Sequence, residues 1–135
     1  MGNNSTFIII LILLVGTVFY FYFQSPKNVN SEIQTTSGEL MRTIPMSVNP
    51  GQTFQITYSS DKQGKWGAII VDSVSGGCLF SNGKTGYKSV MLSENGPQSE
   101  IVEVTAPSSG SCTFTGDYNF EVPIIKFPDQ TIQVK

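Results

Sequence analysis

The stretch Gln52–Ser59, QTFQITYS, alternates apolar and polar side chains along its length. In an extended chain Phe54, Ile56 and Tyr58 would point to one face, and the threonines and the glutamine between them to the other. This period of two predicts a β-strand with one buried face. Asn49-Pro50-Gly51, directly before it, predicts a turn, because proline presets φ and glycine accepts a positive φ. The strand therefore needs further strands to cover its apolar face.

Similar short runs, separated by glycine, proline, asparagine and serine, continue to the C-terminus. In the strand that contains Trp66, the second face carries Ile69 and Val71, which predicts a central strand or one covered on both faces. Asn82-Gly83 predicts a tight hairpin turn. Seven or eight strands in the 97 residues from Glu39 onward predict one all-β domain, a two-sheet antiparallel sandwich. The other strands are expected at Leu40–Val48 with an interruption at Pro45, Gly64–Val71, Cys78–Phe80, Tyr87–Leu92, Ser99–Ala106, Gly110–Phe120 with a bulge at Gly116, and Gln130–Lys135.

The inward positions of these strands predict the hydrophobic core. Each large apolar side chain would contribute about 1.5–3 kcal/mol when fully buried. The sum is comparable to the chain entropy of a domain this small, so an additional constraint would help. Trp66 is assigned to the core, the alternative being an exposed stacking platform for a sugar. The predicted core comprises Phe54, Ile56, Tyr58, Trp66, Ile70, Val102, Val104, Phe114, Phe120, Ile132 and Val134.

The chain has two cysteines, Cys78 and Cys112. A redox pair would usually be C-x-x-C, and a zinc site needs four ligands, which a chain without histidine or further cysteines does not supply. We therefore expect a structural disulfide, which stabilises by about 3–4 kcal/mol in the chain-entropy model. A disulfide implies an oxidising compartment and so favours a domain outside the cytoplasm.

The N-terminal quarter of the sequence has a different character. After a short tail, residues 1–6, the run Phe7–Phe23 contains no charged side chain, and a helix over it would be about 25 Å long. This length is at the short end for a bilayer and predicts a single-pass transmembrane anchor. A cleaved signal peptide is the alternative, although no Lys or Arg precedes the run and bulky aromatics end it. Residues 24–38 are predicted to be a polar linker, and residues 39–135 the domain that it carries outside the cytoplasm.

Three longer motifs resemble a known family. They are RTIPMSVNPGQTFQITY (Arg42–Tyr58), VTAPSSGSCTFTGDYNF (Val104–Phe120) and DQTIQV (Asp129–Val134). In order and spacing they resemble Ig-like β-sandwich modules of archaeal and bacterial surface and secreted proteins, which implies an Ig-like fold and an adhesive, structural or spacer role. Two departures stand out: Cys112 occupies the place of a usual aromatic, and Cys78 follows the Trp66 strand, unlike the disulfide of antibody domains.

Composition argues against several other functions. Eight basic and ten acidic residues leave too little positive charge for a nucleic-acid binder. Without histidine the commonest general base and metal ligand is missing. Asp117, Glu121 and Asp129 could meet at one end of the sandwich, but solvated turn residues explain them better than a Ca²⁺ site. We therefore expect no enzyme, no catalytic residues, no cofactor, no metal and no small-molecule substrate.

The sequence as a whole predicts a single-pass membrane protein with an extracytoplasmic Ig-like domain. Its partners would be the lipid bilayer, through residues 7–23, and another protein or an envelope component. Two alternatives stay open. One is a subunit of a membrane complex or surface filament that assembles through its N-terminal helix, and the other is a secreted Ig-like module released by signal-peptide cleavage.

Overall fold

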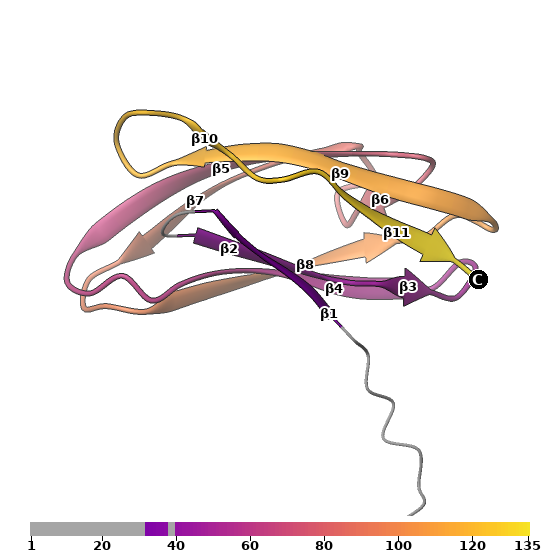
Figure 1. Ribbon diagram of the computed structural model, residues 1–135, viewed down its shortest axis with the longest axis horizontal. Coiled ribbons are helices and arrows are strands. Elements are labelled where there is room, and N and C mark those ends of the chain that lie inside the picture. Colours follow the sequence, from indigo (N-terminus) through magenta and orange to yellow (C-terminus); the bar gives the residue numbers. More distant parts are fainter. Residues whose placement is uncertain (1–31, 38–39) are drawn as a thin grey trace, which may run out of the picture.

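The computed structural model describes residues 32–37 and 40–135, with side chains from residue 40 onward. This part of the chain forms two β-sheets that lie face to face (Figure 1). Sheet A has the strand order β1-β2-β4-β8-β6, and sheet B the order β3-β11-β9-β5-β7, with β10 paired to β9. The strands are β1 Glu32–Ser37, β2 Leu40–Pro45, β3 Ser47–Val48, β4 Thr53–Ser60, β5 Trp66–Ser75, β6 Leu79–Phe80, β7 Gly86–Ser93, β8 Gln98–Thr105, β9 Gly110–Asn119, β10 Ile125–Lys126 and β11 Gln130–Val134.

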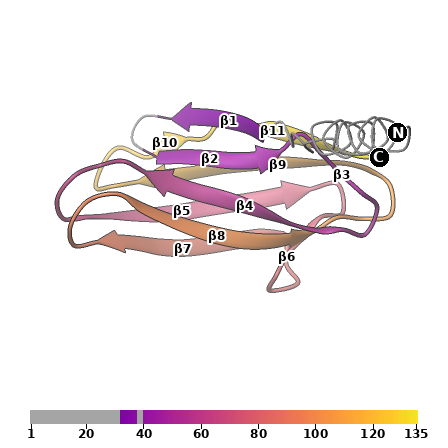
Figure 2. The ribbon, with the colours of Figure 1, turned by 90° about the horizontal axis from the view of Figure 1, so that it is seen from below.

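Seven of the described strands lie in the positions of an Ig-like sandwich, although β6, which pairs with β8, precedes β7 in the chain. In Figure 2, β2, β4 and β8 run side by side in sheet A, in the positions of strands A, B and E. In sheet B, β11, β9, β5 and β7 take the positions of G, F, C and C′. Neighbouring strands of the described chain pair antiparallel, except β3 and β11, which pair parallel. The all-β, two-sheet sandwich predicted from the sequence is confirmed, with eleven strands in the described residues in place of the seven or eight predicted.

Pro45 marks the point at which the chain changes sheets. β2 ends there in sheet A, and β3 begins two residues later in sheet B. Because proline has no N–H to donate to a ladder, a strand readily ends at this residue. The carbonyl of Met46 then accepts a hydrogen bond of 3.3 Å from the N–H of Gln133 in β11. The sequence predicted the interruption but not the change of sheet.

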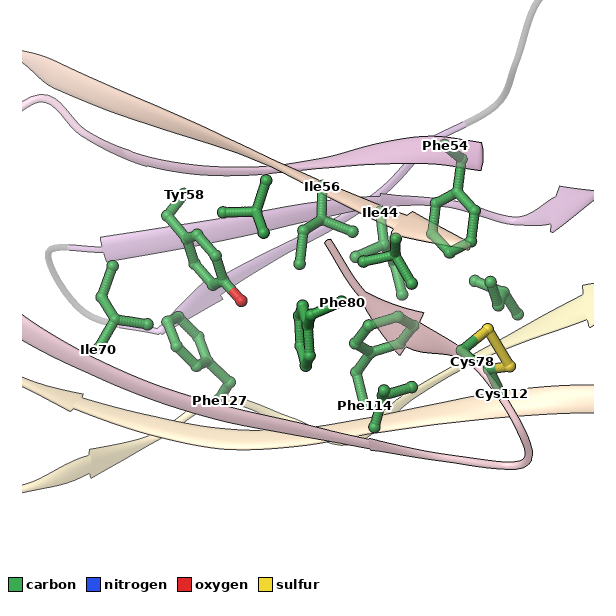
Figure 3. Close-up of a cluster of buried hydrophobic side chains, with 14 of the residues drawn as sticks. Ile44, Phe54, Ile56, Tyr58, Ile70, Cys78, Phe80, Cys112, Phe114 and Phe127 are labelled. Carbon is green, nitrogen blue, oxygen red and sulfur yellow. A yellow bond between two sulfur atoms is a disulfide. The ribbon is translucent and has the colours of Figure 1, made fainter. Parts of the chain in front are cut away.

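Alternating side chains of both sheets fill the core (Figure 3). In β4, Phe54, Ile56 and Tyr58 are buried, as their period of two predicted. Phe120 and Val134 are only partly buried and pack against the edge of the core. The other residues predicted for the core are buried, namely Trp66, Ile70, Val102, Val104, Phe114 and Ile132.

The disulfide between Cys78 and Cys112 is confirmed, with the two Cα atoms 5.9 Å apart (Figure 3). Cys78 lies directly before β6 of sheet A, and Cys112 lies in β9 of sheet B. Both residues are fully buried, so the bond joins the two sheets inside the core. Gly76, two residues before Cys78, has a positive φ, and a Cβ there would lie 1.9 Å from the carbonyl oxygen of Ser111. Glycine is therefore required where the chain turns toward the disulfide.

The predicted linker overlaps a strand. Residues 32–37, predicted to belong to the polar linker, form β1 and pair with all six residues of β2. The sequence EIQTTS has one large apolar residue, Ile33, so no alternation marks it as a strand. Its position is set by backbone pairing with the edge of β2 instead. The prediction is wrong for these six residues, and the rest of the linker lies outside the described residues.

Two details of the predicted strands differ from the structure, and for the Trp66 strand the first of the two predicted alternatives, a central strand, is confirmed. Gly116 forms no bulge, because β9 pairs with β5 in an unbroken register through it. β5 is central in sheet B, but Ile69 and Val71 on its outer face are exposed, so the strand is not covered on both faces. Asn82-Gly83 does form a turn, closed by a hydrogen bond of 2.8 Å from the N–H of Gly83 to the carbonyl of Phe80. It is not a hairpin, since β6 before it belongs to sheet A and β7 after it to sheet B.

Within the described residues, no helix is long and apolar enough to span a membrane. The predicted anchor, residues 7–23, and the N-terminal tail lie outside these residues. The transmembrane segment therefore stays a prediction from the sequence.

Candidate functional site

Four large apolar side chains are exposed together on the outer face of sheet B. They come from β5 and β7 and are exposed by 40% at Ile69, 42% at Val71, 58% at Val90 and 65% at Leu92. We call these four residues the outer patch. Single exposed apolar residues are ordinary on a protein surface, whereas a contiguous group of them marks a candidate interaction site.

The strand register makes the outer patch contiguous. Ile69 lies directly opposite Val90, and Gly67 lies opposite Leu92. A Cβ at Gly67 would meet the Cδ2 atom of Leu92 at 2.9 Å, so the leucine side chain lies over the glycine backbone. Since side chains opposite each other on one face of a sheet lie in contact range, β5 and β7 present an apolar surface that Lys88, which lies opposite Val71, borders at one end.

Charged and aromatic groups border the outer patch near the start of β5. Lys65 forms an exposed ion pair with Glu94, with 3.0 Å between Nζ and Oε2. Lys62 places its Nζ atom 4.7 Å from the centre of the Phe120 ring. A shallow depression of about 350 Å³ lies between these groups, and Gly67 forms part of its wall. An apolar centre with a polar border is the usual anatomy of a protein interface.

Beneath this surface, the core contains a charged network that is closed to solvent. The guanidinium of Arg42 donates two hydrogen bonds of 2.8 Å to the two carboxylate oxygens of Asp72. Its Nε atom donates to Oε1 of Gln130 at 2.8 Å, and its remaining nitrogen donates to two backbone carbonyls. The hydroxyl of Tyr58 donates to Asp72 at 2.6 Å, and the guanidinium carbon lies 4.9 Å from the ring centre of Phe127. The network thus joins β2 and β4 of sheet A to β5 and β11 of sheet B.

Burial dominates the electrostatics of this network. Desolvation raises the pKa of the Asp72 carboxyl above its ordinary value, while Arg42 and the hydrogen bonds to the carboxylate oppose the rise. Desolvation, reinforced by the charge of Asp72 and the hydrogen bond to it, also raises the pKa of the Tyr58 hydroxyl. Both groups are buried, so the network contributes to the packing of the two sheets. Asp72 also lies in the wall of a shallow depression on the surface of sheet B.

A second polar contact closes the sandwich edge between β7 and β8. The Tyr87 hydroxyl donates a hydrogen bond to Glu100, and the Ser89 hydroxyl bonds both carboxylate oxygens of Glu100, at 2.7 and 2.8 Å. Desolvation, followed by the hydrogen bond to Glu100, raises the pKa of Tyr87 to about 12. This carboxylate is engaged in joining the two sheets.

The structure separates the three late acidic residues. Asp117 and Asp129 border one shallow depression of about 390 Å³, while Glu121 borders the other one, near Lys62. Within the described residues, no three His, Cys, Asp or Glu side chains are grouped so that they could hold a metal ion. Trp66 lies in the core, where its indole N–H donates to the carbonyls of Lys62 and Gly96, both at 2.9 Å.

Sequence reasoning missed the charged network, although a signal for it was present. Arg42 stands between Leu40 and Ile44, and Asp72 between Ile70 and Val74, on the inward positions of their strands. A charged residue at an inward position of a strand needs a partner inside the core. One cation and one anion at such positions would have predicted this ion pair.

No protein family and no curated protein matches the sequence. Among solved structures, the chain is similar to a chain in the crystal structure of the complex between zinc 2-glycoprotein and prolactin-inducible protein from human seminal plasma. The similarity covers 81% of this chain and 100% of that chain, at 10% sequence identity and a TM-score of 0.48. The function therefore has to be inferred from the residues of this chain.

Proposed function

We propose that the protein is a membrane-tethered, extracytoplasmic Ig-like domain with a non-enzymatic role, which binds a protein partner through its outer patch. The observation that carries the proposal is the contiguous exposure of Ile69, Val71, Val90 and Leu92 on one face of a well-paired sheet. Burial of such a surface against a partner is favourable in proportion to the apolar area removed from water.

The extracytoplasmic placement is supported by two features of the chain. The uncharged run Phe7–Phe23 has the composition of a membrane anchor. The Cys78–Cys112 disulfide is of the kind that persists in oxidising compartments and is rare in the cytosol. Together they favour a domain held at the outer surface of a membrane.

A non-enzymatic role is supported by how the polar groups are used. Catalysis needs acid, base or nucleophilic groups that reach a substrate. Asp72 and Tyr58, whose pKa values are raised, are buried in the network with Arg42. Glu100 is engaged by Tyr87 and joins two strands. These groups stabilise the sandwich and leave its outer face free for binding.

The proposal can be tested with a photo-crosslinking amino acid placed at Val71 in cells that make the protein. The matched control is the same amino acid at Ile101, which is also exposed but lies on β8 of sheet A. We expect a covalent adduct with another protein from position 71 and none from position 101. The substitution Ile69→Lys should remove the adduct, because it places a charge within the apolar surface. Equal adducts from both positions, or none from position 71, would contradict the proposal.

A further inference from the structure

Strand β7 is an edge strand with little protection. It ends the strand order of sheet B, and no other strand of the described chain pairs with its second edge. β7 pairs with β5 over eight consecutive residues without a bulge, and it contains no proline. Such an edge presents unpaired N–H and C=O groups, which are a template for another strand.

Two hydrogen bonds show which backbone groups face this edge. The carbonyl of Thr85, directly before β7, accepts from the N–H of Val74 in β5 at 2.8 Å, so it points into the sheet. The carbonyl of Leu92 accepts from the side-chain amide of Gln98 at 3.3 Å in an exposed contact, so it points away from β5. Backbone groups of successive residues alternate in direction along a strand. The even-numbered residues of β7 therefore point their N–H and C=O groups to this second edge, and their side chains lie on the outer face. The exposed Gln98 side chain occupies the Leu92 carbonyl there and has to move aside when another strand pairs.

We propose that a second copy of this chain pairs with β7 in antiparallel register, with Met91 opposite Met91 on the two-fold axis. This register sets Val90 of each copy opposite Leu92 of the other. It also sets Lys88 of each copy opposite Glu94 of the other. Two apolar pairs and two ion pairs then lie on one face, which is the pattern that favours cross-strand pairing.

Charge complementarity favours this register over the neighbouring registers. With the axis at Val90, each Lys88 would lie opposite Leu92, and with the axis at Leu92, each Val90 would lie opposite Glu94. With the axis at Lys88, the two lysines would face each other. A lone lysine on an edge strand normally opposes pairing. Here Glu94 lies six residues further on and compensates the lysine only in the register centred on Met91.

The dimer goes beyond the proposed function and does not depend on it. Edge pairing uses the backbone of β7 and leaves the outer side of the patch uncovered, so a partner on that face is neither required nor excluded. An interface that uses the same surface on both copies closes as a dimer. Sheet B would then continue across the two-fold axis.

Zero-length carbodiimide cross-linking of the full chain in detergent tests the register directly. Lys88 lies in β7 and Glu94 directly after its end, six residues further on. At roughly 3.4 Å per residue this separation is about 20 Å, so an amide between the two side chains can form only between copies. The Lys65–Glu94 ion pair at 3.0 Å lies within one chain and provides an internal positive control. In an equal mixture of unlabelled and ¹⁵N-labelled protein, we expect Lys88–Glu94 peptides of mixed label. A Lys65–Glu94 link without any Lys88–Glu94 link would overturn the proposal.

Charge reversal gives a second, quantitative test, with the dimer dissociation constant as the readout. Lys88→Glu replaces both ion pairs by repulsive pairs and should weaken dimerisation about tenfold. Glu94→Lys should have the same effect, and the double variant should restore most of the affinity. Lys84→Glu is the control, because it makes the same charge change at an exposed position in the turn before β7. The proposal would be overturned if Lys88→Glu and Lys84→Glu changed the dimer dissociation constant equally. It would also be overturned if the double variant dimerised no more tightly than the single variants.

The two proposals fail separately. A Lys88–Glu94 link together with no adduct from Val71 would contradict the outer patch as a binding site and support the dimer. An adduct from Val71 with a chain that stays monomeric at all concentrations would contradict the dimer alone.

Discussion

Replacing Arg42 by methionine tests whether the buried charge network holds the two sheets together. Arg42 is the only arginine of the chain and is fully buried. The substitution keeps an apolar stem of similar length but removes the ion pair between Nη1 and the two Asp72 oxygens and the hydrogen bond to Gln130. Asp72 would keep its hydrogen bonds from Tyr58 and from the N–H of Ser73, but no positive charge.

The expected loss of stability follows from leaving a carboxylate buried without its cation. Breaking such a pair by removing one partner costs about 3–5 kcal/mol. Two backbone carbonyls that accept from Arg42 also lose a donor. Since a domain of this size is stable by only about 5–15 kcal/mol, Arg42→Met should remove a large part of the free energy of unfolding.

Urea unfolding of the full chain in detergent can measure this loss. Trp66 is the only tryptophan and lies in the core, so its fluorescence reports the unfolding of the sandwich. The double variant Arg42→Met with Asp72→Asn leaves no charge unpaired. Its loss of unfolding free energy should therefore be about 2 kcal/mol smaller than the sum of the losses in the two single variants. This role of the network would be refuted if the unfolding free energy of Arg42→Met lay within 1 kcal/mol of the wild type. It would also be refuted if the losses of the two single variants were strictly additive in the double variant.

Three further predictions concern the core. The folded pKa of Tyr58 is raised, so its contribution to stability is complete below the unfolded pKa near 10 and is lost as the pH rises. Tyr58→Phe should therefore remove about 1 kcal/mol from the fall in unfolding free energy between pH 10 and pH 11. Gly116→Ala should lower the free energy of unfolding in urea by about 1–3 kcal/mol, because its Cβ would lie 2.7 Å from a backbone carbonyl oxygen. Gly86→Ala is the control and should change stability far less, because the space around Gly86 is open. Replacing Cys78 and Cys112 together by alanine should cost about 3–4 kcal/mol, and a loss below 1 kcal/mol would count against a constraint between the sheets.

The fold was predictable because its signals are local. The alternation in β4 and the turn before it depend on residues adjacent in sequence, so Phe54, Ile56 and Tyr58 were assigned to the core correctly. The disulfide followed from the scarcity of other ligands for two cysteines. By contrast, β1 lacks an alternating pattern, and only its partner strand reveals it.

The candidate site was less predictable because it depends on which strands become neighbours. Ile69 and Val71 predicted either a central strand or one covered on both faces, and the sequence did not decide between these alternatives. The packing of the second sheet decides which of the two apolar faces of a strand is buried and which is exposed. A single sequence does not show which strands form that second sheet. The same holds for Gly116, whose missing side chain makes room for the Asp72 carboxylate on the neighbouring strand.

The central claim, an anchored domain outside the cytoplasm, is tested most directly by labelling exposed lysines in intact cells. A membrane-impermeant amine reagent should modify Lys84 and Lys88, which are both exposed, before the cells are lysed. The modified protein should stay in the membrane fraction after washing at high pH. The labelling of known surface proteins in the same cells is the control. If these are labelled while Lys84 and Lys88 react only after lysis, the domain lies inside the cell and the account is contradicted.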